Sequence, residues 1–197
     1  MYTQEALNRD GSVAAGTSSR AEYLAFLHKQ QAAVESQLKS NTEQSVVEVH
    51  NSRNGTSFTL THAAQGLANY PHMRAVNGLL YVSGLSSRRL DGTHRGVTYN
   101  TDGSVNELHI AEQTAAVLDN IESILNVVGA DLTNVIDTTC FLTDMKNYKS
   151  FNNVYNQYFI DGTHGPTRTT VAVKQLPHPN LLIEIKAVAI DPRVKAQ

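Results

Sequence analysis

The sequence predicts an α+β fold in which a mostly antiparallel sheet is covered on one face by two helices. From residue 70 onward the periodic segments follow the order strand, strand, helix, strand, helix, strand, strand. A chain of 197 residues, 41% of them hydrophobic, can form one core of ordinary domain size plus an extension. Because both helices are expected on one face, the other face should be buried against another copy of the chain.

Residues 1–70 are predicted to form an N-terminal extension. Its start is rich in small and polar residues, which favours a flexible segment. Ser19 and Glu22 have the spacing of a capping box and precede apolar residues at helical intervals, so a helix is expected over about 20–40. A weak strand and loop are expected over residues 41–69.

Residues 71–193 are predicted to be the main domain, with a short tail at 194–197. The pair Asn77-Gly78 is a hairpin turn signal between the two apolar runs of segment 75–84. The polar segment 86–104, punctuated by glycines, is expected to be a long loop or an irregular hairpin, and loops of this length are often functional.

The two helices of the main domain are predicted from their apolar periodicity. Segment 109–128 has one apolar face and is followed by Gly129, where a C-cap glycine belongs. A buried strand is expected at 135–142, and Asp144 can cap the second helix. That helix carries an aromatic stripe, which is typical of a core: Tyr148, Phe151, Tyr155, Tyr158 and Phe159.

Composition and charge narrow the classes of function. The formal net charge of −2 makes nucleic acid an improbable partner. Cys140 is the single cysteine, which suits a reducing compartment, and no signal peptide or membrane span is recognisable, so a cytoplasmic protein is expected. The histidines lack the spacing of a metal site, and His178, which lies between two prolines, is the most notable of them.

Glu184 is the first candidate for chemistry. Two β-rich runs, Thr169–Val173 and Leu181–Ala189, are expected to pair as an antiparallel hairpin. If Ile183 and Ile185 pack under the helices, alternation turns Glu184 to the opposite face, towards a subunit interface. The carboxylate can then either form an ordinary ion pair with Lys186 or an arginine, or orient water and transfer protons.

Arg168 is the second candidate, because it follows the rigid pair Gly165-Pro166 at the start of a strand. Its planar guanidinium suits a carboxylate ligand. A salt bridge to Glu184, which a hairpin would permit, is the structural alternative, and a bound substrate could use both residues.

The string Pro166-Thr167-Arg168, followed by an alternating run and by Leu182-Ile183-Glu184-Ile185, resembles the signature of the Rid (YjgF) family. Other matching positions lie outside this string, and the resemblance covers about residues 71–192. These positions are Asn77-Gly78, Tyr81 to Gly84, Gln113-Thr114, Asn120-Ile121, Val128 to Ala130, Phe141 to Met145 and Asn152 to Tyr155.

The resemblance implies a chorismate-mutase-like fold and a homotrimer with active sites between subunits. It also implies hydrolysis of enamines or imines without a metal or organic cofactor, in which Arg168 binds the substrate carboxylate and Glu184 handles the attacking water. Thr170 stands where housekeeping members commonly have cysteine, and Leu85 where they have glutamine. Both departures argue against the housekeeping substrate, 2-aminoacrylate.

Within this family the chain is more similar to 2-aminomuconate deaminases, through Ser83 to Arg89 and Gly165 to Ala189. A substrate with two carboxylates benefits from two cations, so Arg88 or Arg89, in a loop with Ser87, is expected to bind the second one. The alternative for each arginine is a solvated surface. Thr170, Asn152 and the tyrosines near Asn152 are further candidates for substrate binding. The alternative for Thr170 is an ordinary β-branched strand residue.

Three hypotheses therefore remain open. The chain is a 2-aminomuconate deaminase, a broader Rid-type hydrolase of imino acids, or a non-catalytic Rid-fold protein that binds small metabolites. In each case the expected partners are a small molecule and further copies of the chain, without nucleic acid or membrane.

Overall fold

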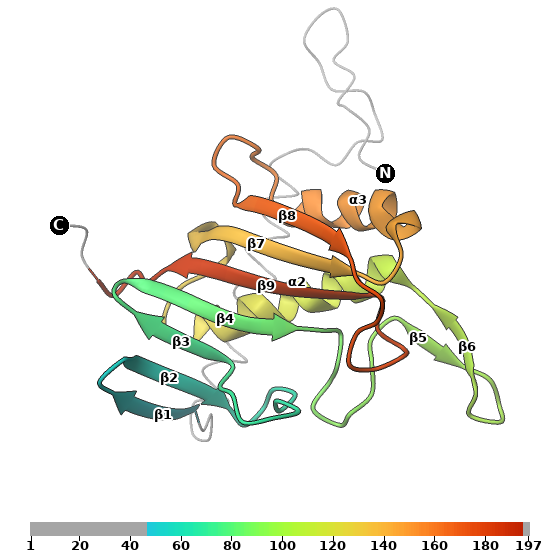
Figure 1. Ribbon diagram of the computed structural model, residues 1–197, viewed down its shortest axis with the longest axis horizontal. Coiled ribbons are helices and arrows are strands. Elements are labelled where there is room, and N and C mark those ends of the chain that lie inside the picture. Colours follow the sequence, from blue (N-terminus) through green and yellow to red (C-terminus); the bar gives the residue numbers. More distant parts are fainter. Residues whose placement is uncertain (1–46, 195–197) are drawn as a thin grey trace, which may run out of the picture. The chain divides into compact units, whose positions relative to one another are not determined.

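The computed structural model describes residues 47–194, which contain a seven-stranded sheet and a separate two-stranded ribbon (Figure 1). The large sheet has the order β1-β2-β3-β4-β9-β7-β8, and all neighbours pair antiparallel except β7 and β8. Its strands are β1 (Val47–Ser52), β2 (Gly55–Leu60), β3 (Met73–Val76), β4 (Leu79–Leu85), β7 (Val135–Leu142), β8 (Thr167–Ala172) and β9 (Ile183–Ile190).

Two helices, α2 (Ile110–Asn126) and α3 (Tyr148–Tyr158), lie behind the sheet in the view of Figure 1. The predicted α+β class is therefore confirmed. Short 3₁₀ turns, η1 (Leu132–Asn134) and η2 (Met145–Asn147), precede β7 and α3. The predicted helix at 20–40 lies outside the described residues. None of the described helices is long and apolar enough to cross a membrane.

The helix and turn signals act where the sequence places them. Gly129 has φ +76° after α2, and the Ala130 N–H donates to the Leu125 carbonyl, as in a glycine-capped helix end. The Asp144 carboxylate accepts from the Lys146 N–H and so starts η2, which leads directly into α3, whereas the N-cap of α3 itself is Asn147. Asn77 and Gly78 both have positive φ in the β3–β4 turn.

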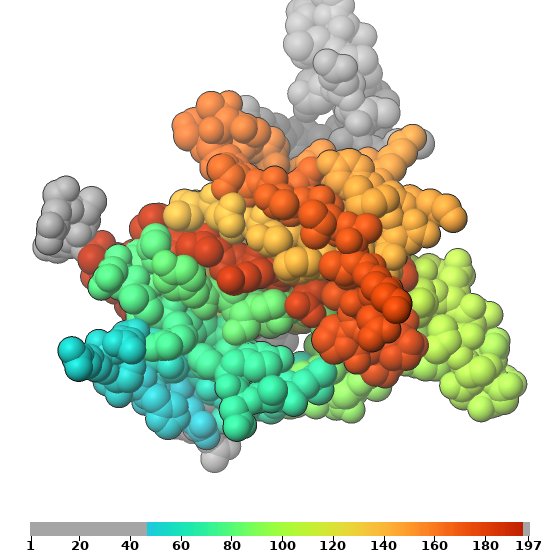
Figure 2. Space-filling model, in the orientation of Figure 1, coloured from blue at the N-terminus to red at the C-terminus, as the bar shows by residue number. Residues whose placement is uncertain are grey.

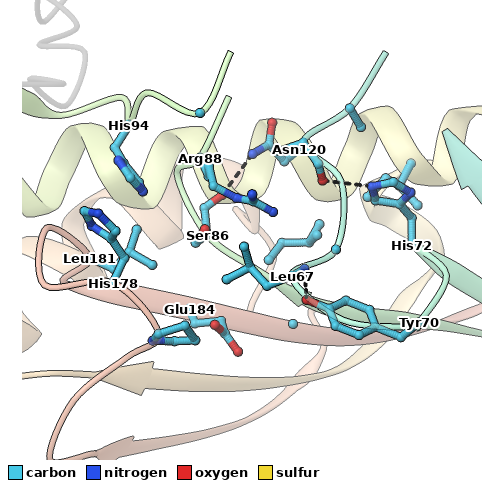
Figure 3. A pocket seen from close by; sticks show the side chains of 18 of the residues that line it. Leu67, Tyr70, His72, Ser86, Arg88, His94, Asn120, His178, Leu181 and Glu184 are labelled. Atoms are coloured by element: carbon cyan, nitrogen blue, oxygen red, sulfur yellow. Dashed lines mark hydrogen bonds between the residues drawn. The ribbon is translucent and has the colours of Figure 1, made fainter. Parts of the chain in front are cut away.

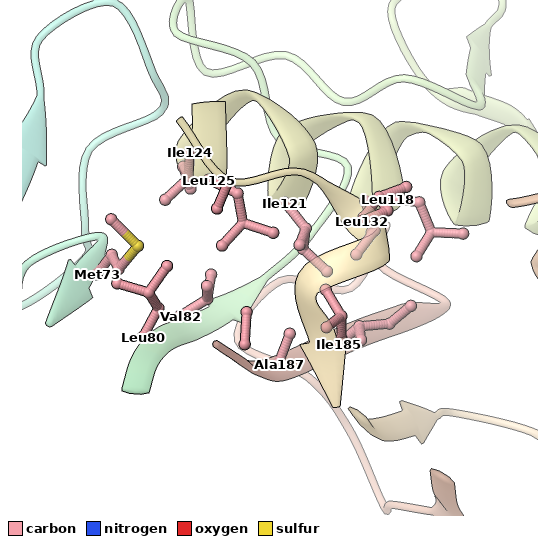
Figure 4. Close-up of a cluster of buried hydrophobic side chains, with 14 of the residues drawn as sticks. Met73, Leu80, Val82, Leu118, Ile121, Ile124, Leu125, Leu132, Ile185 and Ala187 are labelled. Carbon is pink, nitrogen blue, oxygen red and sulfur yellow. The ribbon is translucent and has the colours of Figure 1, made fainter. Parts of the chain in front are cut away.

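The core lies between the sheet and α2 (Figure 4). Alternation along β9 buries Ile183, Ile185 and Ala187 on the helix side, which we call the inner face. The helix contributes one apolar stripe to this core, and β4 adds Leu80 and Val82. The buried residues of the stripe are Val117, Leu118, Ile121, Ile124 and Leu125.

The expected hairpin between the last two strands is wrong. β8 pairs parallel with β7, and β9 inserts between β7 and β4. The connection from β7 through α3 returns the chain beside β7, so β8 takes the sheet edge and only the other side of β7 is open to β9. The intervening segment 173–182 is longer than an ordinary hairpin loop.

Two further segments differ from the expected boundaries. β1 and β2, which fall within the expected extension 1–70, are strands of the large sheet. The expected loop 86–104 contains β5 (Val97–Tyr99), which pairs with β6 (Val105–Leu108) as a ribbon that projects from the sheet (Figure 1). The outer face of the sheet, opposite the helices, is open in the space-filling view (Figure 2).

Candidate active site

A pocket of about 430 Å³ surrounds Glu184 at the end of β4 (Figure 3). Three loops form its walls: residues 61–72, residues 86–96 and residues 173–182. We call this cavity the Glu184 pocket. Its side chains include two leucines, a tyrosine and several polar groups, which are labelled in Figure 3: Leu67, Tyr70, His72, Ser86, Arg88, His94, Asn120, His178, Leu181 and Glu184.

Polar side chains fix each of these three loops. His72 accepts the Leu60 N–H at Nδ1 (3.0 Å) and lies 3.0 Å from the Ala64 carbonyl through Nε2, so both ring nitrogens hold segment 61–72. Asn120 of α2 donates to the Ser86 carbonyl at 3.0 Å. Gln113 of α2, fully buried, donates to the Asn180 carbonyl and accepts the Leu182 N–H. The pocket is therefore preorganised by the same helix that forms the core.

Glu184 points away from the core, as alternation predicts, because Ile183 and Ile185 are fully buried. Gly84 lies against its carboxylate at the bulge of β4, where a Cβ would overlap an Oε atom. Within residues 47–194 no ion pair to Glu184 is formed, neither with Lys186 nor with an arginine. Partial burial raises the pKa of this carboxyl group. It is thus a desolvated, unpaired acid or base.

Arg168 lies on the inner face beside α3. Its guanidinium carbon is 4.6 Å from the Tyr155 ring centroid and 5.2 Å from that of Phe151, and Nη2 donates to the Tyr148 hydroxyl at 3.3 Å. No carboxylate of the described chain pairs with it. Burial raises the pKa of Tyr155 to about 12, so this neighbour stays neutral and the arginine keeps an uncompensated charge.

Thr170 and Asn152 lie in the same region with buried polar atoms left over. Thr170 shares the inner face of β8 with Arg168 and lies beside the Cys140 thiol, and its hydroxyl has no nitrogen or oxygen partner among the described residues. The same holds for Oδ1 of Asn152, which lies one helical turn after Tyr148. Such orphaned atoms are expected where a ligand completes the hydrogen bonding. We call Arg168, Thr170, Asn152, Phe151 and Tyr155 the Arg168 cluster.

The salt bridge between Arg168 and Glu184, which was the alternative to ligand binding, does not form, because the two side chains point to opposite faces of the sheet. Arg168 pairs across β7 with Thr138 and, beyond it, Ala187, which is buried on the inner face. Glu184 pairs with Phe141 of β7. Because side chains alternate along a strand, Phe141 and Thr138 of β7 point to opposite faces. Paired residues in neighbouring strands share a face, so one chain cannot bring both side chains to one substrate.

The two consecutive arginines of the 86–96 loop diverge. Arg88 lines the Glu184 pocket and donates to the Gln65 carbonyl. Arg89 turns outward to the hydroxyl of Thr93, and Ser87 is buried outside the pocket with an unpartnered hydroxyl. Of these three residues, the structure brings only Arg88 to Glu184.

Sequence reasoning missed several residues of both regions. Leu67, Tyr70 and His72 belong to segment 61–72, whose weak periodicity gave no signal of a pocket wall. Tyr148 was expected in the core stripe and among the candidate tyrosines near Asn152, but its contact with Arg168 was not expected. Gly66 and Gly84 lie where the backbone closely approaches Tyr70 and Glu184. These glycines were the signal of the pocket that the sequence offered.

Comparisons with known proteins agree with the fold. The chain matches the family described as Endoribonuclease L-PSP over residues 60–191. A RutC family protein of Aquifex aeolicus is 33% identical over 121 residues, which cover 61% of this chain and 87% of the relative. Protein MMF1, mitochondrial, of Saccharomyces cerevisiae is 31% identical over 129 residues, covering 66% and 79%.

Solved structures of related proteins are also similar to this chain. The crystal structure of YyfA from Yersinia pestis, of the conserved Rid protein family, matches with a TM-score of 0.55 at 30% identity, covering 74% of this chain and 99% of that one. A yeast structure, YEO7, has a TM-score of 0.56 at 29% identity. The chain therefore belongs to the endoribonuclease L-PSP family, which includes the RutC and Rid proteins.

Proposed function

We propose that this protein hydrolyses an enamine or imine without a cofactor, and that its substrate is 2-aminomuconate, which it converts to 4-oxalocrotonate and ammonia. The observation that carries the proposal is the state of Glu184. It is an unpaired carboxyl group in a pocket, and its pKa is raised by burial. A raised pKa brings a carboxyl group closer to neutral pH, where it both takes up and returns protons.

The reaction needs only proton transfers and one water molecule. The enamine first tautomerises to the imine. Glu184 then takes a proton from water as the oxygen adds to the C=N carbon, and it passes this proton to the nitrogen, which gives a neutral carbinolamine. Glu184 next takes the proton of the carbinolamine hydroxyl and returns it to the amino nitrogen as the carbonyl forms and the C–N bond breaks, so that ammonia leaves. One water is consumed for each ammonia released.

We further propose that each complete site combines Glu184 of one chain with Arg168 of a neighbour. The opposite orientation of the two side chains supports this arrangement. Two different surfaces of the chain would meet, and such heterologous contacts close into rings; the family resemblance indicates three chains. The outer face carries exposed apolar side chains suited to burial in such a contact: Tyr81, Val171 and Ile190.

The two anionic ends of 2-aminomuconate match the two cationic regions. The Arg168 cluster would bind the carboxylate next to the reacting carbon, with Asn152 and Thr170 completing its hydrogen bonds. Arg88, in the wall of the Glu184 pocket, would bind the distal carboxylate. Arg89 and Ser87, which turn away from this pocket, have no contact role in the proposed complex.

Ammonia release from 2-aminomuconate by the purified full-length chain tests the proposal, with 2-iminopyruvate as the competing substrate. We expect faster turnover of 2-aminomuconate. Release from 2-iminopyruvate alone would replace the proposed substrate with that of a general imino acid hydrolase. Release from neither would favour a metabolite-binding protein without catalysis.

A further inference from the structure

Two histidines stack on each other in the wall of the Glu184 pocket. The ring centroids of His94 and His178 are 4.4 Å apart, with an angle of 29° between the planes. They come from different loops, 86–96 and 173–182, and lie together at one end of the cavity (Figure 3). The proposed deamination uses neither residue.

Their hydrogen bonds leave polar atoms for a ligand. His178 accepts the Asn180 N–H at Nδ1 (3.2 Å), so the neutral ring carries its proton on Nε2 and can donate it. His94 is 5% exposed, yet its Nε2 has no partner within the described chain. A buried polar atom without a partner is costly unless a ligand uses it.

Basic side chains predominate around the stack. The backbone of Arg88 pairs with that of His94 in an isolated β-bridge, and the Arg88 side chain lines the same pocket, as do His62 and His72 of segment 61–72. Glu184 on β9 is the single acidic residue among the described lining residues. Burial, followed by the neighbouring His178 and Arg88, lowers the pKa of His94. These surroundings therefore disfavour protonation of His94.

We propose that Arg88, His94 and His178 form a carboxylate subsite that recognises the second anionic group of a dicarboxylate substrate. The proposal rests on the proposed function for the identity of that substrate. A bound carboxylate supplies the negative charge that the stack lacks, so binding is coupled to proton uptake by an imidazole. The cavity of about 430 Å³ is within the usual range for small-molecule sites.

Muconate and sorbate are suitable unreactive probes, because both are six-carbon dienes and only muconate has two carboxylates. Calorimetry on the assembled full-length protein should show that His178→Phe, which keeps the stack but removes the Nε2–H, weakens muconate binding about tenfold. Sorbate binding should change by less than about twofold, since the Arg168 cluster can hold its single carboxylate. His178→Gln, which retains an N–H donor, should recover part of the loss.

The adjacent arginines give a second, independent pair of variants. Arg88→Met should weaken muconate binding about tenfold or more, and Arg89→Met should leave it within about twofold, because only Arg88 lines the pocket. Muconate binding should also strengthen from about pH 8 to about pH 6 with measurable proton uptake. His164→Gln, on a histidine outside the pocket, is the control for removing an imidazole.

Equal muconate affinities in wild type, His178→Phe and Arg88→Met would overturn the subsite. Because muconate does not react, this result is independent of turnover. Loss of muconate affinity in these variants, in a protein that releases no ammonia from 2-aminomuconate, would keep the subsite and reject the proposed function.

Discussion

The Glu184 pocket and the Arg168 cluster are built in contrasting ways, and their two key side chains point to opposite faces of one sheet. The pocket is a cavity between three loops, and its carboxyl group is unpaired and partly desolvated. The Arg168 cluster is packed: the guanidinium lies over aromatic rings of α3, and the surrounding polar atoms lack partners. The first region is suited to moving protons, and the second to holding an anion in a fixed orientation.

The contrast indicates that neither region is a complete site. A general acid or base needs a positioned substrate, and an arginine clamp alone moves no protons. Strand order explains why one chain separates them, since β7 lies between β8 and β9 and the two residues are out of phase across it.

The largest expected effect comes from inactivating the two regions in separate chains. Glu184→Gln should lower kcat by about 10²–10⁴-fold through loss of the acid-base group, and Arg168→Ala should lower kcat/KM by about 10²-fold or more through loss of the carboxylate anchor. Co-expressed in equal amounts, the two inactive chains should recover about a quarter of wild-type sites, because some neighbours then contribute an intact Glu184 and an intact Arg168.

Ammonia release measured on the co-expressed and separately expressed proteins checks this complementation. Lys186→Gln, on an exposed neighbour of Glu184 on the same face, is the matched control and should stay near wild type. If the mixed protein is no more active than the sum of its parts, the two residues do not share a site.

A smaller effect is expected from filling the space beside Glu184. Gly84→Ala adds a methyl group where the carboxylate lies, so Glu184 must move. A displacement of this kind should lower kcat by roughly 10–100-fold with little change in the unfolding midpoint. Gly162→Ala, at a glycine with open space around its Cβ position, should have no effect on turnover. Wild-type kcat in Gly84→Ala would show that the position of this carboxylate is not critical.

The smallest expected effect concerns stability and its pH dependence. Burial raises the pKa of Glu184 in the folded state above its unfolded value. The folded chain then binds this proton more tightly, so the group's stabilising contribution is complete below about pH 4, near the unfolded value, and is lost as the pH rises through the folded pKa. At neutral pH, Glu184→Gln should therefore be more stable than wild type by roughly 0.5–1 kcal/mol.

Urea unfolding at one protein concentration, at about pH 4 and about pH 7.5, checks the sign. The gain should shrink towards the lower pH, and Lys186→Gln should show no such trend. A gain that is equal at both pH values would mean that desolvation of Glu184 is not its cause.

The sequence predicts the helices and strands of this fold better than it predicts which strands pair. The apolar stripe and Gly129 locate α2, and strict alternation in β9 places Glu184 opposite Ile183 and Ile185, as the structure confirms. These features depend on local periodicity, which is written directly into the chain. Strand pairing is a long-range property, so two adjacent β-rich runs were mistaken for a hairpin although β7 separates them.

The candidate site shows the same limit. Arg168 and Glu184 could be named from the sequence, but their opposite faces follow from the register of three strands. The wall formed by segment 61–72 depends on His72, whose ring binds backbone groups of residues 60 and 64. Likewise, the meeting of His178 with His94 follows from Gln113, which ties down the 173–182 loop from a distant helix. No local pattern encodes such contacts.

The alternation of β9 also protects the site against misfolding. A slip of one residue against β7 would turn Glu184 into the core and expose Ile183, Ile185 and Ala187 to water. The chain would lose three buried apolar side chains and gain a buried charge, so the slipped register is strongly disfavoured. The buried side chains that stabilise the core therefore also fix the face to which the Glu184 carboxylate points. A chain with the slipped register would not form this core.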